Sequence, residues 1–154
     1  MRRSLLCLTA SLLFVGCAPT GDDDDDSQAP CEGTMDWTFN TTADAGADGA
    51  TCALSQGPTF ITINTANADN SVNWQVSFSD FAGEGTFDIV SFGDWNITGY
   101  AGESWWATAG TITVETWADP ELVGTFDATG ANADDSATMS ISGSFDVTVA
   151  PYVE

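Results

Sequence analysis

The side chains of this sequence that could take part in chemistry are almost all carboxylates. Its 154 residues include 23 Asp and Glu, no His, and two basic residues, Arg2 and Arg3. A serine or cysteine nucleophile would therefore lack a histidine base, and no lysine is present for Schiff-base chemistry. Nucleic acid is not expected as a partner, because its binding depends on Lys and Arg. The composition predicts a protein that is not an enzyme.

Carboxylates alone leave one catalytic scheme open. A glycosidase needs two Asp or Glu side chains that flank the sugar bond. The candidates are Glu84, Asp94, Glu103 and Glu115, but nothing in their spacing pairs any two of them. A carboxylate-only glycosidase is therefore the third hypothesis, behind a binding or structural role and behind sugar binding without catalysis.

Six tryptophans favour carbohydrate binding as the second hypothesis. An exposed indole ring beside Asp, Asn or Glu is typical of a sugar-binding face. Trp105 and Trp106 are adjacent, so on a strand they point to opposite faces and are both buried only if both faces are covered. We expect Trp37, Trp74 and one of this pair in the core. The candidate ligand-binding residues are Trp95, Trp105, Trp106 and Trp117.

Aspartates in predicted loops suggest calcium as the one candidate cofactor. The segment 44–49 resembles the start of an EF-hand loop, but Gly46 stands where the second ligand belongs and Ser55 where the closing glutamate belongs. The EF-hand is therefore rejected. An irregular calcium site, completed by backbone carbonyl groups, remains a prediction. Its candidate ligands are Asp44, Asp48, Asp69, Asp134 and Asp135.

The elements that would position these side chains are antiparallel strands. Four segments open on a glycine and a small hydroxyl residue and then alternate apolar with polar residues, which is the pattern of half-buried strands. They are 85–89, 110–114, 124–128 and 143–149. A turn at 117–121 and a loop at 129–136 separate the last three, and folding there sets Phe126 between Ile112 and Met139.

Further strands are predicted at 35–39, 58–64, 72–81, 94–100 and 104–107, with a loop at 44–50. Connections of hairpin length and the absence of a helical period predict an all-β fold. The expected architecture is an antiparallel meander that forms a β-sandwich or flattened β-barrel of about eight strands. Residues 31–154 are expected to form this single domain.

The N-terminal segment reads as a targeting sequence. Residues 1–16 combine two arginines with a short apolar run, which predicts a signal peptide that is too short to span a bilayer. Residues 17–30 include five consecutive aspartates, which repel one another and bury nothing. They predict a disordered acidic tether. Cys31 and Cys52 are then an even pair in an oxidising compartment, so we expect a disulfide between them.

Two sets of residues resemble uncharacterised bacterial lipoproteins. The residues before Cys17, Phe14-Val15-Gly16, resemble a lipobox, and the β motifs over 110–114, 123–126 and 141–145 resemble the C-terminal half of such proteins. The resemblance implies that Cys17 is acylated and becomes the first mature residue. It also implies a membrane-anchored domain of the cell envelope, in the outer membrane or at the cell surface of a diderm host. We expect a non-enzymatic role there, with a carbohydrate or a protein as the ligand.

Overall fold

The computed structural model describes residues 32–151 except 48–49, 58 and 92, and it confirms the all-β prediction. The predicted signal peptide and tether, with Cys17 and Cys31, lie outside these residues. The strands are β1 (Gly33–Phe39), β2 (Thr42–Ala45), β3 (Cys52–Gly57), β4 (Phe60–Ala66), β5 (Val72–Phe78), β6 (Gly85–Asp88), β7 (Trp95–Ala101), β8 (Ser104–Ala118), β9 (Glu121–Asn132) and β10 (Thr138–Ala150).

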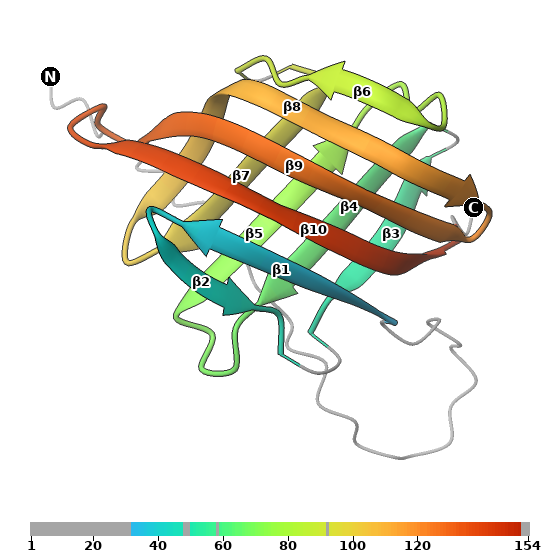
Figure 1. The fold of residues 1–154 in the computed structure, drawn as a ribbon, viewed down its shortest axis with the longest axis horizontal. Coiled ribbons are helices and arrows are strands. Elements are labelled where there is room, and N and C mark those ends of the chain that lie inside the picture. The colour runs from blue at the N-terminus through green and yellow to red at the C-terminus, as the bar shows by residue number, and fades with distance from the viewer. Residues whose placement is uncertain (1–31, 48–49, 58, 92, 152–154) are drawn as a thin grey trace, which may run out of the picture.

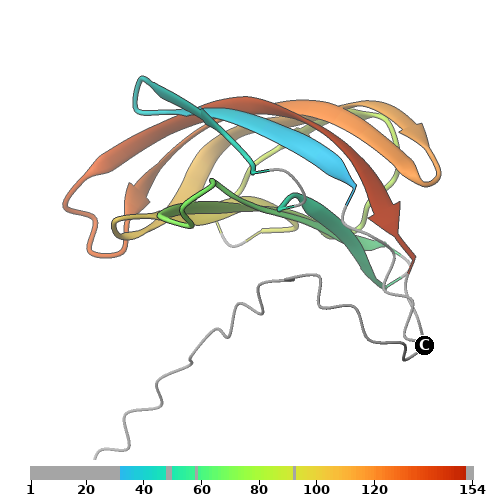
Figure 2. The same ribbon diagram turned by 90° about the horizontal axis from the view of Figure 1, so that it is seen from below.

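The strands form two layers that cross at an angle (Figure 1). The front layer holds β1, β10, β9 and the C-terminal half of β8, with β2 and β6 at its edges. The back layer holds β3, β4, β5 and β7, together with the N-terminal part of β8. Figure 2 shows the two layers one above the other, so each has an inner face toward the core and an outer face toward solvent.

The two layers belong to one sheet that closes on itself. Strand β8 joins them on one side, because residues 104–106 pair with β7 and residues 111–114 pair with β6. On the other side the end of β10, at Val149 and Ala150, pairs in parallel with β3. The remaining neighbouring strands pair antiparallel. The ring β3-β4-β5-β7-β8-β9-β10 is therefore a flattened barrel, with β1, β2 and β6 added along its front.

Strand β8 passes from the back layer to the front layer at a bulge between Ala107 and Ala109. Gly110 follows directly and has a φ of 136°, a conformation that side chains with a Cβ rarely adopt. A Cβ there would also collide with the backbone carbonyl oxygen of Asp127 on β9. The glycine that opens the predicted strand 110–114 is therefore required where β8 turns from one layer into the other.

Large apolar side chains from both layers fill the interior. Each contributes about 1.5–3 kcal/mol relative to an exposed position, which makes this core the main source of stability. The most deeply buried are Trp74, Phe78, Phe145, Met35, Ile63, Ile97, Ile112, Leu122 and Ile141.

Two glycine–phenylalanine pairs set the register of β9 and β10. Phe126 lies opposite Gly143, and Gly124 lies opposite Phe145, all four on the inner face. Each ring occupies the space in front of the opposing glycine: a Cβ at Gly143 would come within 2.6 Å of Cζ of Phe126, and one at Gly124 within 2.5 Å of Cζ of Phe145. The two G-x-F sequences are therefore complementary when the strands run antiparallel.

The predicted register is confirmed for one pair of strands and wrong for the next. Ile112 pairs with Phe126 as expected. The predicted pair of Phe126 with Met139 is wrong, because Met139 pairs with Gly130, four residues along β9. The loop between β9 and β10 is shorter than the predicted loop 129–136, because β9 continues to Asn132. The side chain of Asn132 closes the turn. A shift by an even number of residues leaves each side chain on its expected face.

The structure has ten strands instead of about eight. Strand β3 lies between two predicted elements, and β2 overlaps the predicted loop 44–50. Both were missed because neither shows a clear alternation: β2 is exposed along its whole length, and β3 includes a bulge at 55–57.

Candidate binding face

The acidic residues are divided unequally between the two layers. Strands β3, β4, β5 and β7 contain no Asp or Glu. The strands of the front layer and its edges carry Asp36, Asp44, Asp88, Glu115, Glu121, Asp127 and Asp146. The described part of the back layer therefore has an uncharged outer face in a chain with 23 acids.

Carboxamide side chains take the place of acids on that outer face. They alternate along β4, β5 and β7 with the buried residues of the core. Within the described residues their side chains make no hydrogen bond to another protein group, and the buried Oδ1 of Asn96 has no partner at all. The amides of Asn64, Asn73 and Gln75 each have both donors and an acceptor to offer. The carboxamide residues of this face are Asn64, Asn73, Gln75 and Asn96.

Strand pairing arranges these side chains in rows. Asn64 pairs with Gln75, Gln75 with Thr98, and Thr98 with Trp106, so one row crosses β4, β5, β7 and β8. A second row runs from Asn73 to Tyr100 and Ser104. A third contains Thr62, Ser77 and Asn96. We call these three rows the carboxamide face.

Two aromatic side chains lie on the carboxamide face. Tyr100 is 45% exposed, and Trp106 is half-buried on the outer side of β8. They lie on adjacent strands, and Tyr100 pairs with Ser104, two residues before Trp106. Such diagonal neighbours are about 7–8 Å apart, so both rings can touch one extended ligand.

The other three predicted ligand-binding tryptophans do not lie on this face. Trp95 and Trp105 are only 8% and 6% exposed, so their prediction as sugar platforms is wrong. Trp95 stacks on Phe87 with ring centroids 3.7 Å apart, and Trp105 packs edge-on against Phe39 at 5.3 Å. Both lie at the buried positions of the alternation, Trp95 with Ile97 on β7 and Trp105 with Ala107 on β8.

Trp117 also belongs to the interior side of its strand. It pairs with the buried Leu122 and packs edge-on against Phe81, with ring centroids 5.1 Å apart. Of the four candidates only Trp106 therefore faces outward. Of the two strands that pair with β8 at Trp106, β7 carries no acid, whereas β9 carries Glu121 and Asp127.

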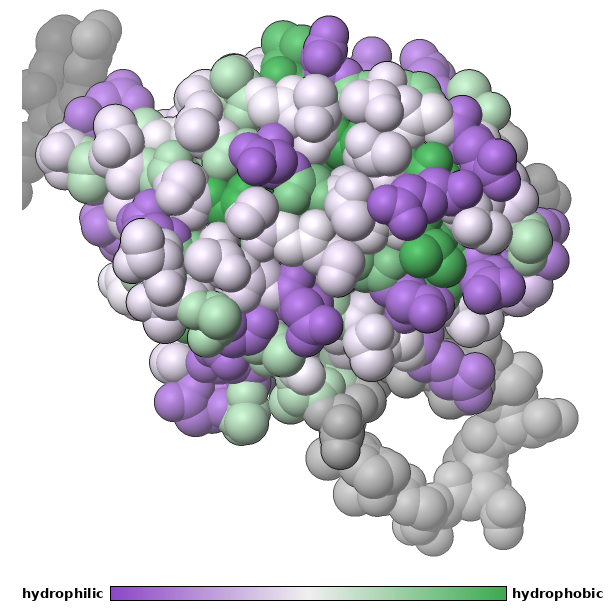
Figure 3. Space-filling view, in the orientation of Figure 1, coloured by the Kyte–Doolittle hydropathy of each residue, from purple (hydrophilic) through white to green (hydrophobic). Residues whose placement is uncertain are grey.

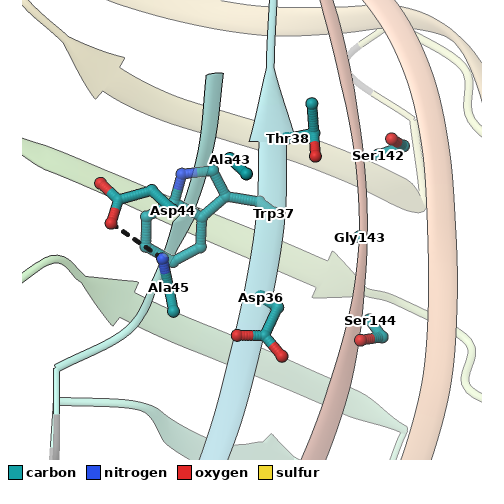
Figure 4. Close-up of a pocket in the computed structure, with 9 residues that line it drawn as sticks. All are labelled: Asp36, Trp37, Thr38, Ala43, Asp44, Ala45, Ser142, Gly143 and Ser144. Carbon is teal, nitrogen blue, oxygen red and sulfur yellow. Dashed lines mark hydrogen bonds between the residues drawn. The ribbon is translucent and has the colours of Figure 1, made fainter. Parts of the chain in front are cut away.

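A shallow open groove of about 610 Å³ lies on the outer face of the front layer. Figure 4 shows Asp36 and Thr38 of β1 beside Ser142 and Ser144 of β10, with Gly143 between the two serines. The ring of Trp37 is buried and offers no surface to a ligand. On this face hydrophilic side chains are scattered rather than gathered in one area (Figure 3). The groove has hydroxyl groups and two carboxylates, those of Asp36 and Asp44, but no aromatic platform.

The hairpin loop between β4 and β5 is held by the side chains of its own residues. Oδ1 of Asn67 accepts a hydrogen bond from the backbone N–H of Val72 at 3.0 Å, and its Nδ2 donates to Oγ of Ser71 at 3.2 Å. The backbone N–H of Ser71 donates to Asp69 at 3.0 Å. The hydroxyl of Ser71, and then this N–H, hold the pKa of the Asp69 carboxyl below its usual range.

The loop between β9 and β10 repeats this arrangement. Oδ1 of Asn132 accepts from the backbone N–H of Ala137 at 2.9 Å, and its Nδ2 donates to Oγ of Ser136 at 2.9 Å. The backbone N–H of Ser136 donates to Asp134 at 3.1 Å. The hydroxyl and N–H of Ser136 likewise lower the pKa of the Asp134 carboxyl. Two N-A-D-x-S sequences, 65 positions apart, thus close two hairpins in the same way.

The candidate calcium ligands do not converge within the described residues. No three His, Cys, Asp or Glu side chains in the described residues converge where they could hold a metal ion. Asp69 and Asp134 each accept hydrogen bonds within their own loop, and Asp44 accepts from the N–H of Ala45 and from Asn67. Asp135 lies in the second loop with a φ of 56°, and Asp48 lies outside the described residues.

The remaining predicted site residues take structural positions. Cys52 is disulfide-bonded, and because Cys31 lies outside the described residues, the pairing of the two stays a prediction. Among the glycosidase candidates, Glu84 accepts a hydrogen bond from the backbone N–H of Trp117, and Glu103 accepts one from Asn132. Both carboxylates therefore stabilise turns.

Comparisons with known proteins add no further information on the site. No family model matches this chain, and neither the curated proteins nor the solved structures include one that is significantly similar to it. In the described part of the chain, no helix is long and apolar enough to cross a membrane. The candidate binding face is thus defined by the chemistry of its own residues.

Proposed function

We propose that this chain is a lipid-anchored protein of the cell envelope that binds an uncharged carbohydrate, without catalysis, through the carboxamide face. The observation that carries the proposal is the absence of charge on that face in so acidic a chain. Sugar hydroxyl groups both donate and accept hydrogen bonds, as carboxamides do, and the apolar faces of sugar rings stack on aromatic rings.

A purely structural role is supported less well by these residues. For a purely structural role, the side chains on a solvent-exposed sheet face need only be hydrophilic. In the front layer they are hydroxyl groups and carboxylates. Some of these bond to one another, as Thr86 does to Thr113 at 3.0 Å. On the carboxamide face, by contrast, the amides have no protein partner within the described residues. Apart from the buried Oδ1 of Asn96, their hydrogen-bonding groups therefore remain available to a ligand.

Retention on polysaccharides tests the binding proposal. The full chain, purified in a detergent without a sugar head group, should be retained on at least one neutral polysaccharide and not on anionic polygalacturonate. Gln75→Ala and Trp106→Ala should each reduce retention about tenfold or more, which matches the loss of one stacked ring or one bidentate amide. Gln75→Ala should keep a melting temperature close to that of the parent chain, because the Gln75 side chain makes no hydrogen bond within the described residues.

A matched variant on the other layer provides the control. Thr38→Ala in the front groove removes a hydroxyl group that has no hydrogen-bond partner among the described residues and should leave retention unchanged. If the chain is retained on no neutral polysaccharide, or if Thr38→Ala reduces retention as much as Gln75→Ala does, the proposal is wrong.

The membrane anchor is tested separately. The lipobox-like residues before Cys17 support acylation of this cysteine, so Cys17→Ser should move the protein from the membrane fraction to the soluble fraction or stop its processing. Cys7→Ser, within the predicted signal peptide, is the control and should change neither. Normal cleavage of the Cys17→Ser chain with full membrane retention would contradict the lipid anchor.

A further inference from the structure

The central row of the carboxamide face has a direction and a length. It runs from Asn64 through Gln75 and Thr98 to Trp106, one residue on each of four adjacent strands. Three steps between neighbouring strands cover about 14 Å, the length of several sugar rings in an extended chain. The two flanking rows place further polar groups on both sides of this line, so a ligand that lies along it meets hydrogen-bonding groups at both edges.

From this arrangement, which rests on the proposed sugar binding, we infer that the ligand is an extended, flat, uncharged oligosaccharide of the β-1,4-linked type. It lies across the strands, with one ring stacked on Trp106 and its other end at Asn64. A β-1,4-linked chain with equatorial hydroxyl groups is nearly straight. It presents apolar ring faces to an aromatic platform and hydroxyl groups along both edges, which matches one indole at the end of a row of amides.

The charge of the protein excludes anionic glycans from this position. The 23 carboxylates are balanced by no basic residue after Arg3, and the acidic loop residues Asp69 and Glu103 lie at the ends of the strands that form the face. A uronate or a phosphorylated sugar on the face would meet the field of these groups with no cation to offset it. A neutral glycan is not repelled by these carboxylates.

Calorimetric titration of the full chain with cello-oligosaccharides of two to six units tests the inference. Affinity should rise about tenfold or more from the disaccharide to the tetrasaccharide and change less than threefold beyond it, because the row is then filled. Asn64→Ala should weaken binding of the tetrasaccharide but not of the disaccharide, which occupies only the Trp106 end. Trp106→Ala should abolish both, and Gln75→Ala should weaken binding of the tetrasaccharide.

The outcomes separate this inference from the proposed function. Equal affinity for all lengths, or equal binding of the curved α-linked malto-oligosaccharides, would overturn the inference while sugar binding stands. The inference would also be overturned, with sugar binding still standing, if the chain were retained on some neutral polysaccharide but bound no cello-oligosaccharide. Binding of oligogalacturonates as tight as that of cello-oligosaccharides would overturn the uncharged ligand. If the chain binds no neutral polysaccharide, the proposed function fails as well.

Discussion

Replacing Gly143 by alanine will lower the stability of the domain by about 2 kcal/mol, as expected for a methyl group forced into a filled core. A Cβ at this position would collide with the backbone carbonyl oxygen of Asp36 and lie 2.6 Å from Cζ of Phe126. Gly143 lies between β1 and β9, so neither neighbouring strand can withdraw without breaking its pairing. Thermal unfolding of Gly143→Ala should show a melting temperature roughly 5–10 °C below that of the parent chain.

Gly57→Ala is the matched control for this prediction. No atom lies within 4 Å of a Cβ at Gly57, so the substitution removes the same backbone freedom without a collision. It should be neutral or stabilise the fold by up to about 1 kcal/mol, because alanine restricts the unfolded chain. Equal melting temperatures for the two variants would show that Gly143 does not lie against Phe126 and that the register of β9 and β10 is different.

The same residues show how far the sequence specifies this fold. Alternation of apolar and polar residues predicts the all-β class and most strands, because burial of one sheet face is a local property of the pattern. The register of β9 and β10 depends on two strands at once. Its signal is the complementarity of Gly124-Thr125-Phe126 with Gly143-Ser144-Phe145, which becomes visible only when one sequence is reversed against the other.

The candidate site was predicted only in part for a similar reason. Adjacent Trp105 and Trp106 must point to opposite faces, and the structure shows that Trp106 is the outward one. The side of β8 that faces outward depends on whether its first residues belong to the front or the back layer. No local sequence pattern determines that layer. Tyr100 lies in the predicted strand 94–100, but it was missed because the hypothesis considered only tryptophan as a stacking residue.

One signal of the carboxamide face is present in the sequence. The segments 52–57, 60–66, 72–78 and 95–101 contain no acid, although acids make up most of the charge elsewhere. Acids lie between the later segments, at Asp69 and at Asp80, Glu84, Asp88 and Asp94, and they hide the pattern in the composition. Only the topology, which places β3, β4, β5 and β7 side by side, turns four acid-free segments into one uncharged surface.

This division of charge also links folding to the proposed function. Repulsion among the carboxylates opposes the compact state, and it is smallest where acids are few. On the back layer, therefore, the carboxylates cost an uncharged ligand the least binding free energy. A charged partner also gains the least binding free energy there. The acids of the front layer favour its solvation, and the described groove between β1, β2 and β10 offers no aromatic contact.

The two repeated loops give the second large prediction, because they differ in burial. Asn132 is 2% exposed, and its amide nitrogen donates to Glu103 Oε2 at 2.8 Å and to Ser136 at 2.9 Å. Asn132→Ala leaves the N–H of Ala137 and the Glu103 carboxylate without these partners, so it should cost about 2–4 kcal/mol. Asn67→Ala removes the same set of bonds from a more exposed loop and should cost about 1 kcal/mol.

Chemical denaturation of the two alanine variants measures this difference directly, since the loops have the same sequence pattern and the same bonds. Replacement by aspartate extends the test: Asn132→Asp places a carboxylate beside Glu103 in a buried setting, whereas Asn67→Asp places one beside Asp44 in water. The like-charge pair at the buried position 132 should be the more destabilising of the two at neutral pH, and the difference should narrow as the acids are protonated. Equal costs at the two loops, for both substitutions, would mean that burial of Asn132 does not govern the strength of its hydrogen bonds.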